Sequence, residues 1–315
     1  YIIDELVGVD RTDFNKEEYY KEIFDAIIEL GRAEAFIVAL TDLIKDLAVD
    51  HLHIVGDIFD RGERPDLILD LLEKHHSVDV QWGNHDIMWM GAAMGSPACI
   101  ATAVDLSLKY GNCDLLENGY GISLRTLSSY AEKYFGCDER FLPLSEEHTL
   151  DSRDAMQIAK MRKAIFFLML KLEGALIARH PEYGMADRDL LAHIDFAAQT
   201  VELDGEKLRF DASDLTTVDP SAPHRLTEEE AAVVNSLRRS FLSSEKLKRH
   251  LDFLMSHGSL YLIYNDNLIY HGCIPLRADG SYAEHTEGGR TYAGKAYMDP
   301  VSYTHLRAHE TELHL

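Results

Sequence analysis

Two short polar motifs, each placed at the end of an apolar run, constrain this chain more than any other feature. The first motif reads G-D-x-x-D-R-G over residues 56–62 and follows the apolar run 52–55. The second reads G-N-H-D over residues 83–86 and follows the run 78–82. The segment between them is long enough for one crossover helix, which we expect to begin near Pro65. The spacing therefore predicts a strand–helix–strand unit that brings both motifs to the carboxyl edge of one sheet, where α/β proteins bind ligands.

The side chains of these motifs suit a divalent metal ion. A carboxylate from Asp57, an amide from Asn84 and an imidazole from His85 would meet in one crevice, and manganese accepts such ligands. We expect the glycines at positions 56, 62 and 83 to let the backbone turn sharply and the metal come close. A single G-D or N-H pair is usually turn chemistry. Two complementary clusters after consecutive strands are hard to explain by packing alone.

A histidine near the C-terminal end of the chain is a third candidate. His271 ends the apolar run 268–271 and is followed by Gly272. On its own, such a histidine is usually a hydrogen-bonded core residue. Together with the first two motifs, the strand–His–Gly pattern predicts a metal ligand. The other histidines, including His51 and His53, are interpreted as packing, capping or solvent-exposed residues.

Taken together, the motifs resemble the class 3 fructose-1,6-bisphosphatases of bacteria, which belong to the calcineurin-like metallophosphoesterases. The resemblance extends from Tyr1 to about Asp299 and is carried by residues 50–62, 76–93, 171–174 and 270–276. It implies an α/β fold built as a metallophosphoesterase-type β-sandwich flanked by helices. It also implies a binuclear manganese enzyme that hydrolyses the 1-phosphate of fructose 1,6-bisphosphate to give fructose 6-phosphate in gluconeogenesis.

The resemblance further implies a role for each motif residue. The implied metal ligands are Asp57, which bridges both ions, Asn84 and His271. His85 would protonate the leaving alkoxide, and Asp60 would orient the imidazole ring and stabilise its charge. Arg61 would bind phosphate oxygens through its planar guanidinium. Asp86 is expected to cap a helix or to support the ligands from behind.

The rest of the sequence predicts a core divided by a large insertion. We expect a helical lead-in over 1–48 with helices in 15–48, core strands and a crossover helix over 49–104, a mostly helical insertion over 105–258, return strands over 259–299, and a tail without family resemblance over 300–315. Within the insertion, Gly205 predicts a hairpin near 199–210. Thr227 and Glu230 have capping-box spacing. The predicted fold class is therefore α/β, with the sandwich interrupted by helices.

Two motifs of the resembled family are missing from this sequence. No D-x-H and no Gly-His pair occurs anywhere in the chain. Since these motifs would hold the other metal ion, we expect an internal fragment with an incomplete core and little activity of its own. The alternatives are another metallophosphoesterase, acting on proteins or dinucleotides, and a non-catalytic truncated product. The long insertion counts against the first alternative, because those enzymes place the equivalent of His271 much closer to G-N-H-D.

Composition limits the partners. The net charge of −23 and the pI near 5.0 argue against nucleic acid, but a metal can reverse the local field for a sugar bisphosphate. No apolar run reaches the roughly 18 residues of a membrane span. The four cysteines lack C-x-x-C pairing, which predicts reduced, mostly buried thiols and a cytoplasmic protein. A homo-oligomer is left open.

Overall fold

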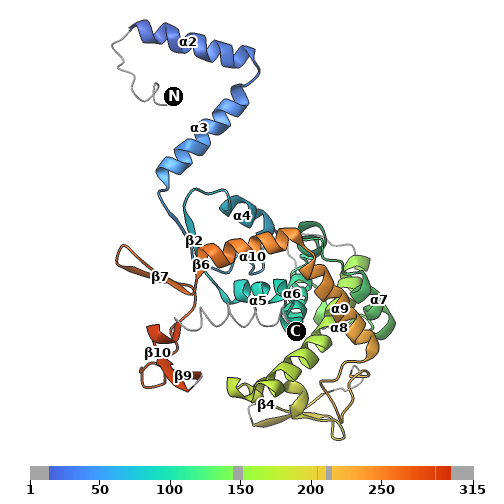
Figure 1. Ribbon diagram of the computed structural model, residues 1–315. Coiled ribbons are helices and arrows are strands. Elements are labelled where there is room, and N and C mark those ends of the chain that lie inside the picture. The colour runs from blue at the N-terminus through green and yellow to red at the C-terminus, as the bar shows by residue number, and fades with distance from the viewer. Residues whose placement is uncertain (1–13, 145–151, 204, 211–214, 288, 299–315) are drawn as a thin grey trace. The chain divides into compact units, whose positions relative to one another are not determined.

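The computed structural model describes residues 14–144, 152–203, 205–210, 215–287 and 289–298. Within these ranges the chain is α/β, with long helices and four small sheets (Figure 1). It divides into two compact units, one of residues 1–52 with 75–78 and one of residues 53–74 with 79–315. The predicted tail 300–315 lies outside the described residues.

The smaller unit is built around two helices, α2 (Phe14–Glu29) and α3 (Ala33–Ala48), so the helices predicted over 15–48 are confirmed. Gly31 separates them with a φ of +64°, a conformation that glycine adopts at little cost at the end of a helix. No residue of α3 is buried, and several of its apolar side chains are exposed, Leu47 to 76% and Ile44 to 65%.

The sheet that carries the motifs contains three strands in the order β1-β2-β6. These strands are β1 (Leu52–Ile54), β2 (Val78–Gln81) and β6 (Gly258–Ser259), with β6 parallel to β2. The predicted crossover helix is α4 (Pro65–Leu72), which begins at Pro65 as expected. The return strands expected from residue 259 onward do not join one sheet: Ser259 pairs with β2, whereas the residues from Tyr261 onward form a separate hairpin. Gly258 allows this close pairing, because a Cβ there would overlap the indole of Trp82.

Helices follow the second motif and make up most of the described part of the predicted insertion. They are α5 (Asn84–Ala93), α6 (Pro97–Lys109), a π-helical turn η1 (Leu115–Gly119), α7 (Arg125–Tyr134), α8 (Ser152–Arg179), α9 (Glu228–Leu242) and α10 (Glu245–His257), with short 3-10 turns at Glu139–Phe141, Pro181–Tyr183, Ala186–Arg188 and Leu190–His193. The capping box of α9 is confirmed: the Glu230 amide donates to Thr227 Oγ1 at 3.2 Å, and the Thr227 amide donates to Glu230 Oε2 at 2.7 Å. The same buried carboxylate accepts from Lys171 Nζ at 2.7 Å and so ties α8 to α9.

The remaining strands form small antiparallel sheets. They are β3 (Ile194–Asp195), β4 (Thr200–Leu203), β5 (Glu206–Arg209), β7 (Tyr261–Tyr264), β8 (Asn267–Tyr270), β9 (Glu284–Glu287) and β10 (Arg290–Ala293). The predicted hairpin near 199–210 is confirmed as β4–β5. In the β7–β8 hairpin, Asn265 and Asp266 both have positive φ, as a tight two-residue turn requires.

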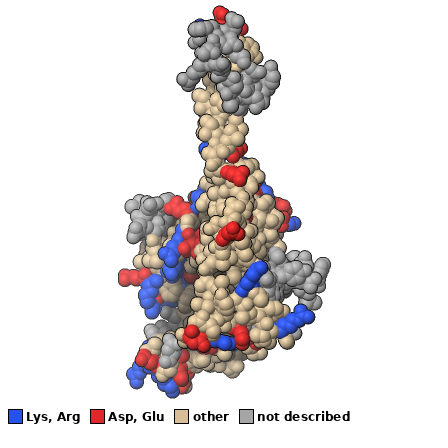
Figure 2. All heavy atoms as spheres, turned by 90° about the vertical axis from the view of Figure 1, so that its left-hand side faces the viewer, with Lys and Arg blue, Asp and Glu red and all other residues tan. Residues whose placement is uncertain are grey.

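The structure tests what the composition predicted about surface charge, membrane helices and cysteines. On the face drawn in Figure 2, the Lys and Arg side chains of the described residues lie among Asp and Glu and form no continuous basic surface. Among the described helices, none combines the length and the hydropathy that a membrane crossing needs. All four cysteines are free, but the expectation that they are mostly buried is wrong, because Cys137 and Cys273 lie exposed in loops.

Candidate metal and phosphate site

The two motif loops are joined by two carboxylates, each of which accepts at least one hydrogen bond from a backbone amide of the other motif. The Asp86 carboxylate accepts hydrogen bonds from the backbone amides of Asp57 at 2.7 Å, Phe59 at 3.3 Å and Gly83 at 2.9 Å. In return, Asp57 Oδ1 accepts a hydrogen bond from the His85 amide at 3.2 Å. The N-cap of α5 is Gly83, and Asp86 accepts from the Gly83 amide as the third residue of a capping box does. Asp86 therefore takes part in capping the helix and also supports the first motif from behind. Burial raises the pKa of the Asp86 carboxyl, although the three amides oppose this.

The backbone of the first motif is strained. Asp57 and Arg61 have φ of +55° and +59°, values that residues other than glycine rarely adopt and that often mark functional sites. The sharp turn expected of the glycines is found at Gly56, whose φ is +80°, and two of the three glycines also lie close to atoms of the protein. A Cβ at Gly83 would overlap the Asp57 carboxylate, and one at Gly56 would overlap the Gln81 carbonyl. Gly62 is different, because its φ is not positive and the atom nearest to an added Cβ would be 3.8 Å away.

The proposed acid and its orienting partner are in contact. His85 Nε2 lies 3.3 Å from Asp60 Oδ1, and both side chains are partly exposed. The same Asp60 oxygen lies 3.3 Å from Arg61 Nε. Ligating atoms of Asp57, Asp60 and His85 all lie within 4.8 Å of one another. These distances place a carboxylate–imidazole pair directly beside the Asp57 carboxylate.

His271 completes this cluster from the end of β8. Its Nε2 lies 3.1 Å from Asp57 Oδ2, and its Nδ1 lies 2.5 Å from the carbonyl oxygen of Val55. A carbonyl only accepts hydrogen bonds, so Nδ1 must carry the proton. In the neutral ring, the lone pair of Nε2 then faces the Asp57 carboxylate, and a proton or a cation between the two is required.

A divalent cation fits that position. Two neighbouring ligands of an octahedral ion bonded at roughly 2.1 Å lie about 3 Å apart, close to the 3.1 Å between His271 Nε2 and Asp57 Oδ2. The Val55 carbonyl holds the His271 ring as outer partners of metal-binding histidines do. The remaining predicted ligand, Asn84, is the first residue of α5 and is exposed, and its side chain has no hydrogen bond among the described residues.

Arg61 lies on a small cleft beside the cluster. Its side chain is 67% exposed, and its Cζ lies 5.6 Å from the ring centre of Tyr110. The cleft is lined by eleven residues, among them His85, Asp60 and Asn112. Tyr110 and Asn112 were not identified from the sequence, because they follow the first motif by about fifty residues and carry no motif of their own.

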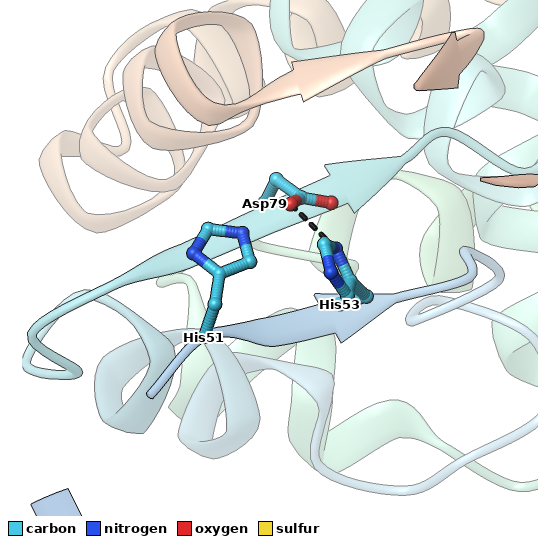
Figure 3. A group of neighbouring side chains, drawn as sticks. All are labelled: His51, His53 and Asp79. Carbon is cyan, nitrogen blue, oxygen red and sulfur yellow. Dashed lines mark hydrogen bonds and ion pairs between the residues drawn. The ribbon is translucent and has the colours of Figure 1, made fainter. Parts of the chain in front are cut away.

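Other histidine–carboxylate groups are satisfied within the protein. Figure 3 shows His53 on β1 and Asp79 on β2 pointing toward each other. His53 Nδ1 lies 2.7 Å from Asp79 Oδ2. His51, drawn in the same figure, bonds to Ser77 Oγ at 2.6 Å. These contacts agree with the structural interpretation of both histidines. His250 contacts Asp70 at 3.1 Å, and Asp70 also binds Lys246 at 2.9 Å, so that carboxylate is already paired with a cation.

Comparison with known proteins points to one family. A family model described as Firmicute fructose-1,6-bisphosphatase matches residues 1–314, a range that continues past Asp299 into the tail. Proteins named fructose-1,6-bisphosphatase class 3 are similar over most of the chain. The one from Clostridium acetobutylicum is 48% identical over 304 residues, which is 96% of this chain and 46% of that protein. The one from Clostridium tetani is 45% identical over 95% of this chain and 46% of that protein. The one from Alkaliphilus metalliredigens is 46% identical over the same shares.

The chain thus spans about half the length of the curated relatives it matches. No solved structure matches it.

Proposed function

Because the chain belongs to the Firmicute fructose-1,6-bisphosphatase family, we propose that it forms part of a metal-dependent phosphatase that converts fructose 1,6-bisphosphate to fructose 6-phosphate. The relatives are about twice as long, so the proposal concerns the full-length protein that carries this chain. The observation that supports it best is the convergence of Asp57, Asp60, His85 and His271 at the ends of three strands.

We assign the metal ligands of this chain to Asp57, Asn84 and His271. Their carboxylate, amide and imidazole groups suit manganese among other divalent ions. A pair of such ions, when bound, would activate the attacking water and neutralise charge on the phosphate. The ligands of the second ion, and the strands that complete a metallophosphoesterase-type sandwich around β1-β2-β6, would come from sequence beyond this chain. We place the enzyme in the cytoplasm.

The other site residues act on the phosphate and on the leaving group. Arg61 offers an exposed guanidinium that can hold two phosphate oxygens at once. As the bond between phosphorus and the sugar oxygen breaks, His85 gives that oxygen a proton, so that the sugar leaves as a neutral alcohol. Asp60 lies 3.3 Å from His85 Nε2 and stabilises the charged imidazole before the transfer.

The proposal is tested by measuring phosphate release from fructose 1,6-bisphosphate by the full-length protein with manganese, beside residues 1–315 alone. We expect turnover by the first and very little by the second, because the ligands of the second ion are missing from the shorter chain. Calorimetry should detect one weakly bound manganese ion on residues 1–315, and Asp57→Asn should abolish that binding. A full-length protein that hydrolyses no phosphate ester would refute the proposal.

A further inference from the structure

The end of helix α6 touches the phosphate-binding part of the first motif. The Asn112 side-chain amide donates hydrogen bonds to the carbonyl oxygens of Arg61 at 3.0 Å and Gly62 at 3.1 Å. Asn112 is itself buried, at 7% exposure. The first bond reaches Arg61, the residue with the left-handed φ of +59°, and the second reaches the residue that follows it. They therefore stabilise a conformation that costs roughly 1–3 kcal/mol when it is unsupported.

The position of Asn112 is well fixed. Gly111 ends α6 with a φ of +76°, and the Asn112 amide donates back to the Ser107 carbonyl at 2.8 Å. This is the geometry of a glycine-terminated helix end, which leaves little freedom to the residue that follows. One residue before the glycine, the Tyr110 ring lies 5.6 Å from the Arg61 guanidinium carbon. The same turn thus contacts Arg61 twice, at its backbone and at its cation.

We propose that Asn112 is a positioning residue for phosphate binding, which holds Arg61 in its left-handed conformation so that the guanidinium lies on the cleft beside His85. Tyr110 supports the same guanidinium from one side through its aromatic face. This inference rests on the proposed phosphatase function and adds a residue that acts through Arg61, without touching the substrate. Its contribution is to the binding of the phosphate group, and it leaves the transfer of the proton untouched.

The test is a double-mutant cycle in the full-length protein. Asn112→Ala should lower kcat/KM for fructose 1,6-bisphosphate by about tenfold, the scale of one to two lost hydrogen bonds. Most of this loss should appear in KM. In an Arg61→Ala background, Asn112→Ala should change kcat/KM less than about twofold, because the residue it positions is already gone. Equal losses in both backgrounds would overturn the proposal.

Inorganic phosphate provides a second measurement. Its inhibition constant should rise in Asn112→Ala by about the same factor as KM, and the kinetic loss should be equal for the sugar ester and for an aryl phosphate. Asn118→Ala is the matched control, since Asn118 is exposed and, among the described residues, its side-chain amide donates only to Asp114, at 2.8 Å. If Asn112→Ala lowers the melting temperature but leaves KM and phosphate inhibition at the wild-type values, the role of Asn112 is structural only.

The outcomes separate this inference from the proposed function. A wild-type protein that cleaves the aryl phosphate but not the sugar ester refutes the substrate assignment, and the cycle can still be run with the aryl ester. A wild-type protein that is active on both esters and indifferent to Asn112→Ala refutes the positioning role alone. A protein inert toward both esters and unable to bind phosphate overturns both proposals.

Discussion

The carboxylate of Asp57 accepts a hydrogen bond from the backbone amide of His85 at 3.2 Å. The residue assigned to the metal ions therefore also satisfies an amide in the first turn of the helix that carries the proposed acid. Amides at this end of a helix lack partners inside the helix, and an oxygen acceptor stabilises them. A substitution at Asp57 thus acts on the helix and on the metal site together, and the two effects need to be measured separately.

Asp57→Asn and Asp57→Ala separate these effects. Asparagine keeps an oxygen acceptor and tolerates a φ of +55°. In residues 1–315, the free energy of unfolding of Asp57→Asn should therefore lie within about 0.5 kcal/mol of the wild-type value. Alanine loses the acceptor, and Asp57→Ala should cost about 1–2 kcal/mol. Urea denaturation without metal measures this difference. In the full-length protein neither variant should hydrolyse fructose 1,6-bisphosphate, and near-normal turnover by metal-loaded Asp57→Asn would contradict the ligand assignment.

His85→Ala tests the proton donor. We expect kcat to fall by about 10²–10⁴-fold on fructose 1,6-bisphosphate, the usual contribution of a general acid. The fall should be much smaller on an aryl phosphate, whose leaving group needs little protonation. Steady-state kinetics on both esters, with bound manganese measured in parallel, gives the answer. Loss of the metal, together with equal loss on both substrates, would mean that His85 is a ligand.

Gly83→Ala and Gly62→Ala form a matched pair. A methyl group at Gly83 would overlap the Asp57 carboxylate, whereas at Gly62 the nearest atom is 3.8 Å away. We expect Gly83→Ala to destabilise residues 1–315 by about 1–3 kcal/mol, as overpacking does, and Gly62→Ala to stay within about 0.5 kcal/mol of wild type. Chemical denaturation of both variants tests this, and equal stabilities would show that the two motif loops are less tightly joined than described.

Asp66 predicts a pH dependence of stability. Its carboxylate is fully buried and binds Arg64 at 2.8 Å and Lys246 at 2.7 Å. Burial alone would raise its pKa, but these cations outweigh burial and lower the pKa from 3.8 to about 2. Because the folded-state pKa is depressed, the stabilisation is complete above pH 4 and is lost as the pH falls toward 2. Asp66→Asn should lower the free energy of unfolding by on the order of 2 kcal/mol at pH 6. The difference in this free energy between the variant and wild type should become smaller between pH 4 and pH 2. A difference that is constant across this range would refute the account.

The local parts of the fold could be predicted because their signals are local. The capping box of Thr227 and Glu230 and the helix start at Pro65 each depend on a few neighbouring residues, and both are observed. The meeting of Asp57 and His85 followed from a rule about where neighbouring strands end. His271 was predicted from the strand–His–Gly pattern instead, and it follows β8, which belongs to a separate hairpin. The distances between the ligating atoms of these residues are as short as metal binding needs.

The contacts that were missed join residues far apart in the chain. Asn112 reaches Arg61 across about fifty residues, and no spacing rule links the end of one helix to a distant loop. Gly258 likewise approaches the indole of Trp82 closely, and only the packed sheet reveals this contact. Gly62 could not be distinguished from Gly56 and Gly83 in the sequence, because the motif does not show which of its glycines are required by close contacts in the folded protein.

The pairing of β2 with β6 has a consequence for how such a protein can change over time. The chain leaves the sheet at Gln81 and returns to the neighbouring strand at Gly258, so everything between these residues is, topologically, one loop with its ends side by side. The entropy of closing a loop grows only slowly with its length, and a block with adjacent ends can be lengthened, shortened or exchanged without rethreading the sheet. This helical block can therefore vary in nature, or be exchanged between homologues, while the strands that carry Asp57 and His85 stay as they are. Such changes are a route by which an ancestral hydrolase could acquire new selectivity.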